Sequence, residues 1–536
     1  MFPKKANVRS YDNKQQLLFP PLIGDLLPED HLAHVVDDAV EAIDLGIFYE
    51  KIPEVGNMSY DPALMIKVWF YGYATGVCSS RRIEAALYTD VAFMYLAGMQ
   101  KPDFKILSEF RRENIKELKG IFIGILKIYH ELGITKLGRI SIDSKVMKGN
   151  ASADNTYTEE ELEKELERIE KEIDKYIEEV EWREAEEDIR YGAEKRGDEL
   201  ADGIKKKEER IKKMKELKEK LKRKKEELKK REIKEINITD GDVRLQKGKG
   251  WVIGGYRGQI AVDENQIIIA CDVTEEQNDK RQLIPMIEAV MENIEKVKGD
   301  GGKSEREREW VEEEIKDKKW EKIKVLSDAG YYSIKNLVKL EESKFKEKID
   351  AYIAYKREGE MLGCRWEGEE MDRLKEEGFK YKEEEDVVIC SSGGKLYRGG
   401  GSMSRSGVRY YVYRNCKACK NCNKRGDCIG KSRYKRVWIS EHRLLVKEMK
   451  EKLSTKEGKE IYSKRKSTAE PVHGNLAHNL GFRGFLLRGK EKVRGEYFFM
   501  CIAHNILKIS KFIKDVGKTL KEMLIFKRSL PTFNTS

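Results

Sequence analysis

Three carboxylates stand where their side chains could hold metal ions. Asp143 follows the run Arg-Ile-Ser-Ile, Asp328 follows Ile-Lys-Val-Leu-Ser, and Glu470 lies in the basic segment Tyr462–Gly474. We expect each Asp to end a β-strand and Glu470 to lie on a helix. Carboxylate oxygens are the ligands that Mg²⁺ and Mn²⁺ take, and two such ions about 3.5–4 Å apart support in-line phosphoryl transfer. The three residues therefore predict a two-metal phosphoryl-transfer site.

The sequence around these carboxylates resembles the DDE transposases of bacterial insertion sequences, in which a helical N-terminal module precedes a ribonuclease H-like catalytic domain. The resemblance implies an α/β fold of that type, with Asp143, Asp328 and Glu470 as catalytic triad and Mg²⁺ or Mn²⁺ as cofactor. It also implies cleavage of DNA at the terminal inverted repeats of an insertion sequence and strand transfer into target DNA. The segments that carry it are Asp61-Pro to Arg112, the Asp143 block, Asn237-Ile-Thr-Asp240, Gly255-Tyr-Arg-Gly-Gln259, Asn278-Asp279, Asp328-Ala-Gly-Tyr-Tyr and Glu470-Pro-Val.

The resemblance also assigns side chains beside Glu470. Family members carry a Tyr and an Arg ahead of the catalytic Glu; Tyr462 matches the first, and Arg465 or Lys466 the second. We expect these three residues to contact DNA. Family members also carry a Lys seven residues beyond the Glu, where this chain has Ala477, and His478 or Arg483 could replace that phosphate contact only in part. A nucleophilic hydroxyl that forms a protein–DNA bond is the alternative chemistry, and Tyr462 is its one candidate.

Three rival functions account for part of the sequence. A metal-dependent nuclease of the same fold would cut DNA without strand transfer, and a non-catalytic DNA-binding protein would keep the triad without using it. A coiled-coil scaffold would explain residues 159–230 alone. Strand-transfer products separate a transposase from a nuclease, and divalent-metal binding at the triad separates both enzymes from a non-catalytic protein.

Length and composition favour a multidomain protein that meets nucleic acid. The chain has 536 residues, enough for two or three cores, and 106 Lys and Arg against 96 Asp and Glu give a formal net charge of +10. No apolar run reaches the roughly 18 residues that a membrane span needs. The nine Cys are an odd number, which fits a reducing compartment better than a disulfide framework. We therefore expect a cytoplasmic, nucleoid-associated protein with no membrane partner.

Residues 1–135 are expected to form a helical DNA-binding module. Asp61-Pro62 is typical of a helix start. The third helix, which carries the basic residues, begins near Asp103 or Ser108. Three short helices with basic residues on the last are typical of a helix-turn-helix reader, although a helical module with solvated charges has the same pattern. The resemblance favours DNA binding. The predicted phosphate contacts are Lys105, Arg111 and Arg112.

Residues 157–236 are expected to form a charged helical hairpin inserted into the catalytic domain. Glu159–Asp188 holds 16 acidic and 5 basic residues, whereas Lys205–Lys230 holds 15 basic and 6 acidic residues. Both arms carry aliphatic residues at helical spacing. Opposite charges on two amphipathic helices favour antiparallel pairing of the arms over DNA binding by the basic arm.

The catalytic domain is expected in three pieces, residues 136–156, 237–356 and 451–515, followed by a tail over 516–536. In a ribonuclease H-like sheet the strands that precede Asp143 and Asp328 are neighbours, so their side chains can converge. We also expect the enzyme to act as a homodimer or larger assembly, because two DNA ends must be joined in one event. Further polar residues of the domain either line the site or cap loops, and a structural role is favoured for all except Asp242, which is a weak candidate for an auxiliary metal ligand. These residues are Asp240, Asp242, Gln259, Asn278 and Asp279.

Residues 357–450 are expected to be a second insertion, rich in Gly and Cys. Cys416, Cys419, Cys422 and Cys428 place four thiols within a short segment. The spacing favours a structural Zn²⁺ site. An iron–sulfur site and free thiols are the alternatives, the first because the initial spacing is similar, although the fourth Cys is spaced differently.

Overall fold

The computed structural model describes residues 22–52, 59–191, 202–248, 251–299, 322–355, 378–405, 408–429 and 432–529. The chain divides into two compact units, one from residues 1–113 with 506–536 and one from residues 114–505. Residues 192–201, between the two arms of the charged insertion, and residues 357–377 of the second insertion lie outside the described residues. None of the described helices combines the length and apolar character needed to cross a membrane.

The first unit is helical. The side chain of Asp61 accepts a hydrogen bond from the backbone N–H of Ala63 at 2.7 Å and so caps the helix that Pro62 begins. That helix, α3, is buried on nearly every side, and α1 and α5 pack against it. The elements of the unit are η1 (Ile23–Leu26), α1 (Leu32–Glu41), α2 (Gly46–Tyr49), α3 (Pro62–Ala74), α4 (Ser80–Thr89), α5 (Val91–Leu96), α6 (Phe104–Glu113) and α19 (Leu520–Ser529).

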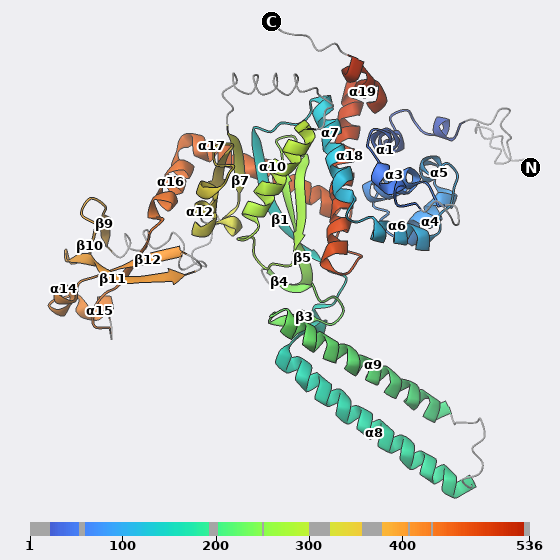
Figure 1. Ribbon diagram of the computed structural model, residues 1–536, viewed down its shortest axis with the longest axis horizontal. Helices are drawn as coiled ribbons and strands as arrows, with labels where there is room; N and C mark the ends of the chain where they lie inside the picture. Colours follow the sequence, from blue (N-terminus) through green and yellow to red (C-terminus); the bar gives the residue numbers. More distant parts are fainter. Residues whose placement is uncertain are drawn as a thin grey trace, which may run out of the picture. The chain divides into compact units, whose positions relative to one another are not determined.

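The centre of the second unit is a mixed six-stranded sheet (Figure 1). Its strands run in the order β4-β5-β1-β7-β8, and β6 also pairs with β5. Strand β5 is antiparallel to β1, β4 and β6, whereas β1, β7 and β8 are parallel. Strands β6 and β7 are buried along nearly their whole length, as in a sheet covered on both faces. The strands are β1 (Arg139–Lys148), β4 (Arg244–Gly248), β5 (Trp251–Val262), β6 (Ile268–Thr274), β7 (Ile323–Ser327) and β8 (Ile349–Ile353).

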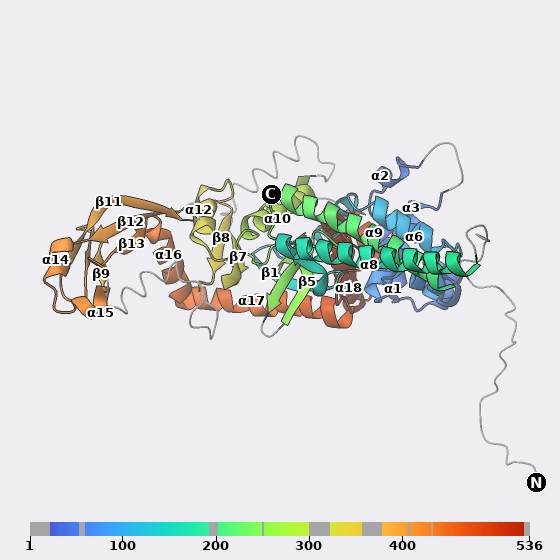
Figure 2. The ribbon, with the colours of Figure 1, turned by 90° about the horizontal axis from the view of Figure 1, so that it is seen from below.

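Helices cover both faces of this sheet. Figure 2 shows α10 (Leu283–Gly299) and α12 (Ile334–Glu342) on one face and α17 (Lys456–Gly474) on the other. Helix α18 (Lys490–Val516) approaches β5 so closely that a Cβ at Gly258 would lie 2.7 Å from the ring of Tyr497. Helix α7 (Leu118–Leu132), which was expected in the N-terminal module, packs against α10. The apolar side chains of α7 explain this placement, because they complete the core beside the sheet.

The charged insertion forms two helices, α8 (Glu159–Tyr191) and α9 (Asp202–Lys230). Thr158 and Glu161 form a capping box at the start of α8, with N–H to side-chain oxygen distances of 2.8 and 3.4 Å. Apolar residues of both helices form one core, to which β2 (Thr156–Thr158) and β3 (Glu235–Asn237) add a closing pair of strands. Ion pairs across the helices fix an antiparallel alignment, which agrees with the charge pattern: Glu159–Lys229, Glu163–Lys225 and Glu170–Lys218.

The second insertion contains a five-stranded antiparallel sheet in the order β13-β12-β11-β10-β9. The Gly-rich segment lies largely in β11, which pairs with the next strand, β12, in an antiparallel hairpin. Two short helices that carry the clustered Cys residues follow β12, and α16 (Arg443–Ser454) leads to α17. The other elements are β9 (Lys380–Lys382), β10 (Val387–Ile389), β11 (Lys395–Arg405), β12 (Val408–Arg414), β13 (Val437–Ser440), α14 (Cys416–Lys420) and α15 (Arg425–Ile429).

Candidate active site

Asp143 and Asp328 lie at the same level of two adjacent parallel strands. The pairing of β1 with β7 ends at Ile142 and Ser327, and the two Asp residues come directly after these partners. The predicted neighbour relationship is therefore present. The prediction that Asp143 ends its strand is wrong, because β1 continues to Lys148 through antiparallel pairing with β5.

A further carboxylate, Asp279, lies beside Asp328. Asp328 accepts a hydrogen bond from the N–H of Gly330 at 2.8 Å. A Cβ at Gly330 would lie 2.9 Å from Oδ1 of Asp328 and 3.3 Å from Oδ2 of Asp279. The two carboxylates thus flank the same glycine, and a larger side chain at this position would push against both.

Hydrogen bonds hold Asp279 in place. The carboxylate accepts from Arg257 at 3.0 Å and from the side-chain amide of Gln259 at 2.7 Å, and the hydroxyl of Tyr331 donates to Gln259. Asp279 is buried, so these donors balance its charge. A positioning role beside the site follows from these contacts.

Asp242 lies in a different set of contacts. Its carboxylate accepts hydrogen bonds from Arg231 at 2.7 Å and from the N–H of Lys490 at 2.8 Å. Neighbouring Asp240 accepts from the hydroxyl of Tyr256 at 2.8 Å. Both residues join structural elements, which favours a structural role for Asp242 over that of an auxiliary metal ligand.

Arg465 of α17 links the triad. Its guanidinium lies 3.6 Å from the carboxylate of Asp143 and 3.7 Å from that of Glu470. Burial lowers the pKa of Arg465, but the charges of Asp143, Asp328 and Glu470 outweigh burial and raise it overall. All three predicted catalytic carboxylates therefore act on one guanidinium.

Contacts between α17 and β1 place Arg465 and Glu470 near Asp143. The hydroxyls of Thr468 and Ser141 are 2.5 Å apart and both are buried. Ser141 and Asp143 lie on the same face of β1 because side chains alternate along a strand. The helix is thus fixed over the strand face that carries Asp143.

His473 and Lys145 fill the space beyond Asp143. Burial lowers the pKa of His473 to about 3, so its ring is neutral at pH 7, and its Nε2 lies 4.0 Å from Asp143. The ammonium of Lys145 donates to the backbone carbonyl of His473 at 3.3 Å. Lys145 shares its strand face with Asp143 and carries positive charge, whereas Ala477 carries none.

The side chain of Asp143 is mostly buried, with 16% of its surface exposed. Burial raises the pKa of Asp143 to about 7; Arg465 opposes this shift, and the carboxylates of Asp328 and Asp279 add to it. As the side chains are placed, no three His, Cys, Asp or Glu residues of the described ranges come together closely enough to hold an ion. In this arrangement, Arg465 supplies the positive charge between Asp143 and Glu470.

Tyr462 and Lys466 flank Arg465 on α17. Burial raises the pKa of Tyr462, so its phenol stays protonated, which disfavours the alternative chemistry with a nucleophilic tyrosine. Lys466 is exposed on the same helix. The helix therefore presents a phenol and two cations beside the three carboxylates.

The structure corrects one predicted DNA contact in the first unit. Arg111 is only 5% exposed, donates hydrogen bonds to the hydroxyl of Tyr73 at 3.1 Å and the carbonyl of Cys78 at 3.3 Å, and stacks 4.4 Å over Trp69. The prediction that it contacts phosphate is wrong, because its guanidinium stabilises the core between α3 and α6. The sequence carried the signal: Arg111 follows the buried Leu107 by four residues on one helix.

Other basic side chains of the first unit remain on the surface. Lys105 is exposed, and half-exposed Arg112 pairs with Glu109 at 3.1 Å. Arg81 and Arg82 at the start of α4 are also exposed, and Arg81 lies 4.7 Å over the ring of Phe104, the neighbour of Lys105 in sequence. Sequence analysis missed this pair, although both follow the helix-start signal of α4.

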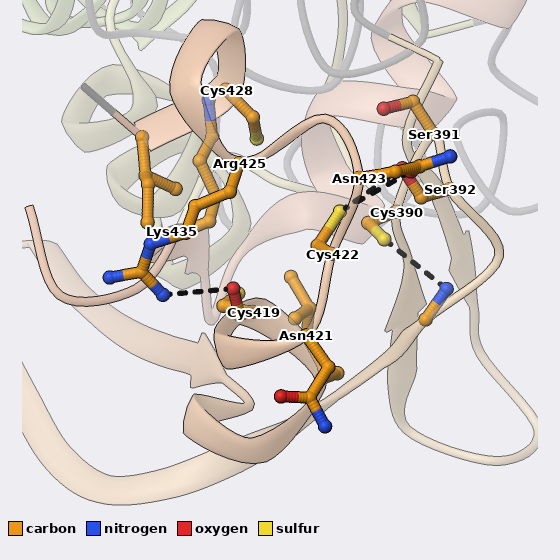
Figure 3. A pocket seen from close by; sticks show the side chains of 14 residues that line it. Cys390, Ser391, Ser392, Cys419, Asn421, Cys422, Asn423, Arg425, Cys428 and Lys435 are labelled. Atoms are coloured by element: carbon orange, nitrogen blue, oxygen red, sulfur yellow. Dashed lines mark hydrogen bonds between the residues drawn. The ribbon is translucent and has the colours of Figure 1, made fainter.

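The predicted thiol cluster changes by one member. Cys419, Cys422 and Cys428 line a cavity of 410 Å³, and the additional Cys in its wall is Cys390, not Cys416 (Figure 3). Cys416 is exposed at the first turn of α14 and is absent from the lining of this cavity. The set predicted from spacing therefore differs from the thiols that line the cavity, which include Cys390 in place of Cys416. Cys390 lies too far away in sequence to be grouped with the cluster by spacing alone.

Two segments of the chain match known families. Residues 22–113 match the family described as Transposase domain (DUF772), and residues 389–510 match the family described as Transposase DDE domain. The second segment holds Arg465 and Glu470, whereas Asp143 and Asp328 lie outside both. Neither the curated proteins nor the solved structures contain a match to the chain.

A DDE domain implies a ribonuclease H-like fold and the use of divalent metal, and the order of the mixed sheet agrees with that fold. The chain is therefore a DDE transposase, a polynucleotidyl transferase that carries an N-terminal transposase domain and a DDE catalytic domain.

Proposed function

We propose that Asp143, Asp328 and Glu470 are the catalytic triad and that they hold two Mg²⁺ or Mn²⁺ ions. The observation that carries this assignment is the shared interaction of all three carboxylates with Arg465, which brings residues from β1, the end of β7 and α17 to one place. The substrates in this proposal are the terminal inverted repeats of the protein's own element and the target DNA. Cleavage at the repeats is followed by strand transfer.

The donor set fits a divalent ion. Carboxylate oxygens are hard ligands. Burial and neighbouring negative charge disfavour the ionised form of Asp143, which a bound cation would stabilise. When bound, two divalent ions activate water or a 3′ hydroxyl and stabilise the leaving oxygen. Asp279 is held by Arg257 and Gln259, so it supports the position of Asp328 rather than serving as a ligand.

Basic side chains supply the contacts to the DNA backbone. Arg465 presents several N–H donors and can form paired hydrogen bonds to a phosphate. Lys145 lies on the same strand face as Asp143, and we assign to it the phosphate contact that Ala477 cannot make. Tyr462 and Lys466 extend this surface along α17. Each of these groups favours the negative charge that develops during phosphoryl transfer.

The first unit binds DNA through its exposed cations. Lys105, Arg81 and Arg82 are the principal candidates, and Arg112 contributes after it leaves Glu109. Each phosphate contact should add about −0.9 to the slope of log affinity against log salt concentration. Buried Arg111 should add nothing to that slope. The enzyme acts as a homodimer or larger assembly, since two element ends are joined in one event.

The test is an assay of cleavage and strand transfer on DNA that carries the element's own ends. Asp143→Asn, Asp328→Asn and Glu470→Gln should each abolish both steps and leave DNA affinity nearly unchanged. Glu460→Gln is the matched control, because Glu460 is an exposed carboxylate on the same helix. Normal cleavage by the Asp143 variant would overturn the triad, and cleavage without any strand transfer by the wild-type protein would identify a nuclease.

A further inference from the structure

Four thiols surround the cavity in the second insertion. Figure 3 shows Cys390, Cys419, Cys422 and Cys428 around the same space, from three separate segments of the chain. They come from the turn between β10 and β11, the C-terminal half of α14 with the turn after it, and α15. No disulfide joins them. Convergence of thiols from separate segments calls for a physical reason beyond packing.

The turn that holds Cys390 directs backbone donors toward its sulfur. The N–H of Gly394 donates to Sγ of Cys390 at 3.2 Å, and the N–H of Cys390 donates to the carbonyl of Gly394 at 2.9 Å. Gly393 adopts a φ of +79°, which closes the turn. An N–H partner on sulfur is the kind of outer interaction that orients a metal ligand.

The opposite wall is also ordered around the thiols. Asn415 caps α14 by accepting from the N–H of Ala418 at 3.0 Å, and its amide donates to the carbonyl of Lys395 at 2.7 Å, which ties α14 to β11. Sγ of Cys422 lies 3.5 Å from the hydroxyl of Ser392, within the Cys390 turn. These contacts bring the Cys419-x-x-Cys422 pair against the turn that carries Cys390.

The small sheet has a limited apolar core beside the thiols. Its apolar core consists of six buried side chains, and Cys390 and Cys428 pack at the edge of that core. Domains with so small a core usually need a disulfide or a structural metal. A metal at the cavity would join the β10–β11 turn to α14 and α15 at the place where the apolar core ends.

We propose that Cys390, Cys419, Cys422 and Cys428 bind one structural Zn²⁺, and that Cys416 is not a ligand. The pair Cys419-x-x-Cys422 has the spacing that structural zinc sites use. Binding requires the thiols to turn into the cavity, because as placed no three His, Cys, Asp or Glu side chains of the described residues lie close enough together to hold an ion. Every thiol that binds releases its proton to solvent, and no electron is transferred.

The charges around the cavity suit this site. A zinc ion with four thiolates carries a net double negative charge, and Arg425 and Lys435 both line the cavity. The guanidinium of Arg425 donates to the carbonyl of Cys419 at 3.0 Å, so it is held beside the predicted ligands. Among the residues that the structure describes, neither an Asp nor a Glu lines this cavity. The surroundings therefore favour a thiolate-bound metal over a hard cation.

The test uses the full-length protein purified under reducing conditions with ZnCl₂ present, followed by removal of loosely bound metal and elemental analysis. We expect one zinc per chain in the wild-type protein and in Cys416→Ser, and loss of zinc in Cys390→Ser. Cys416→Ser is the matched control, since Cys416 lies on the same helix as Cys419. Zinc retained by Cys390→Ser and lost by Cys416→Ser would overturn the assignment.

A second measurement needs no substitution. Alkylation of the folded wild-type protein, read by mass spectrometry, should modify Cys416 rapidly and spare Cys390, Cys419, Cys422 and Cys428 until a chelator is added. Co²⁺ in place of zinc should give the visible absorption of a tetrahedral thiolate site. Equal alkylation of all five thiols with and without chelator, or a brown iron-containing protein, would overturn the proposal. Because the experiment reads no DNA cleavage, its failure would leave the assignment of the catalytic triad unaffected.

Discussion

Arg465 and Asp143 form an ion pair of 3.6 Å between a helix and the central strand of the catalytic sheet. The same guanidinium lies 3.7 Å from Glu470, so it occupies the space between two proposed metal ligands. A cation in this position balances carboxylates that would otherwise repel each other. Binding of divalent ions would release the guanidinium toward a phosphate of the DNA.

Arg465→Ala should slow DNA cleavage by about 10²–10³-fold, the usual effect of removing one electrostatic contact to the transition state. Affinity for Mn²⁺ should be unchanged or higher, because a competing cation has been removed. Cleavage rates at saturating metal and a metal titration of the free protein measure the two effects. Lys464→Ala, an exposed cation on the same helix, should retain normal rates. A normal rate for Arg465→Ala would show that the guanidinium has only a structural role.

Metal binding at Asp143 should depend on pH. The folded-state pKa of Asp143 is about 7, above its usual value, so the protonated carboxyl stabilises the metal-free fold. That contribution is complete below the pKa of the unfolded chain and is lost as pH rises through 7. Mn²⁺ competes with the proton, so the rise in Tm that it produces should be larger at pH 8 than at pH 6.

The control for this pH effect is Asp143→Asn, which removes the titrating group. In that variant, the rise in Tm produced by Mn²⁺ should be small and nearly equal at the two pH values. Equal and large shifts at both pH values in the wild-type protein would mean that the metal does not bind to Asp143.

Arg111→Ala should destabilise the protein without a specific effect on DNA contacts. Its guanidinium makes two hydrogen bonds and stacks on Trp69, so we expect a loss of about 2–3 kcal/mol in the free energy of unfolding. Denaturant titration of the full chain measures this loss. Arg112→Ala, half-exposed on the same helix, should change stability by about 0.5 kcal/mol or less. An Arg111 variant of normal stability but weakened DNA binding would show that Arg111 contacts DNA.

Arg82→Ala should weaken DNA binding with little effect on stability. Loss of one phosphate contact should reduce the magnitude of the salt slope by about 0.9. The measurement is the affinity for element ends at several salt concentrations. Glu84→Gln is a nearby control that removes no positive charge. An unchanged slope for the Arg82 variant would place the DNA on another surface.

Replacing residues 160–233 with a short glycine-containing turn should leave the catalytic sheet folded, because β2 and β3 keep their pairing at Thr158 and Glu235. The acidic and basic arms already neutralise each other, so DNA affinity should be nearly unchanged. We expect weaker assembly, measured by analytical ultracentrifugation, if the hairpin reaches a second protomer. Loss of DNA affinity with an intact oligomer would instead identify α9 as a DNA clamp.

The sequence predicted the catalytic region well where local pattern and topology agree. The runs before Asp143 and Asp328 were predicted to be neighbouring strands, and they pair in parallel. The place of Asp143 within its strand could not be predicted, since the antiparallel partner that extends β1 comes about a hundred residues later. Long-range pairing of this kind leaves no trace in local periodicity.

Other errors have similarly specific causes. Arg111 was assigned to DNA from its charge, yet its position four residues after Leu107 places it on the buried stripe of α6. The Cys cluster was defined by spacing, whereas Cys390 reaches the cavity from a turn of the sheet. Charge type alone does not resolve which face of a helix a side chain occupies, and spacing alone does not group residues that lie far apart in the sequence.

The pairing of Thr158 with Glu235 also has a consequence for the folding route. These residues mark the two ends of the hairpin insertion, so formation of α8 and α9 from mostly local contacts brings distant parts of the chain together early. Strands β1 and β5 then close a loop of about 25 residues instead of about 100, which lowers the entropic cost by about 1 kcal/mol. Changes in the length of the two helical arms alter neither end of this loop. Insertions and deletions within the hairpin should therefore leave the folding rate of the catalytic sheet almost unchanged.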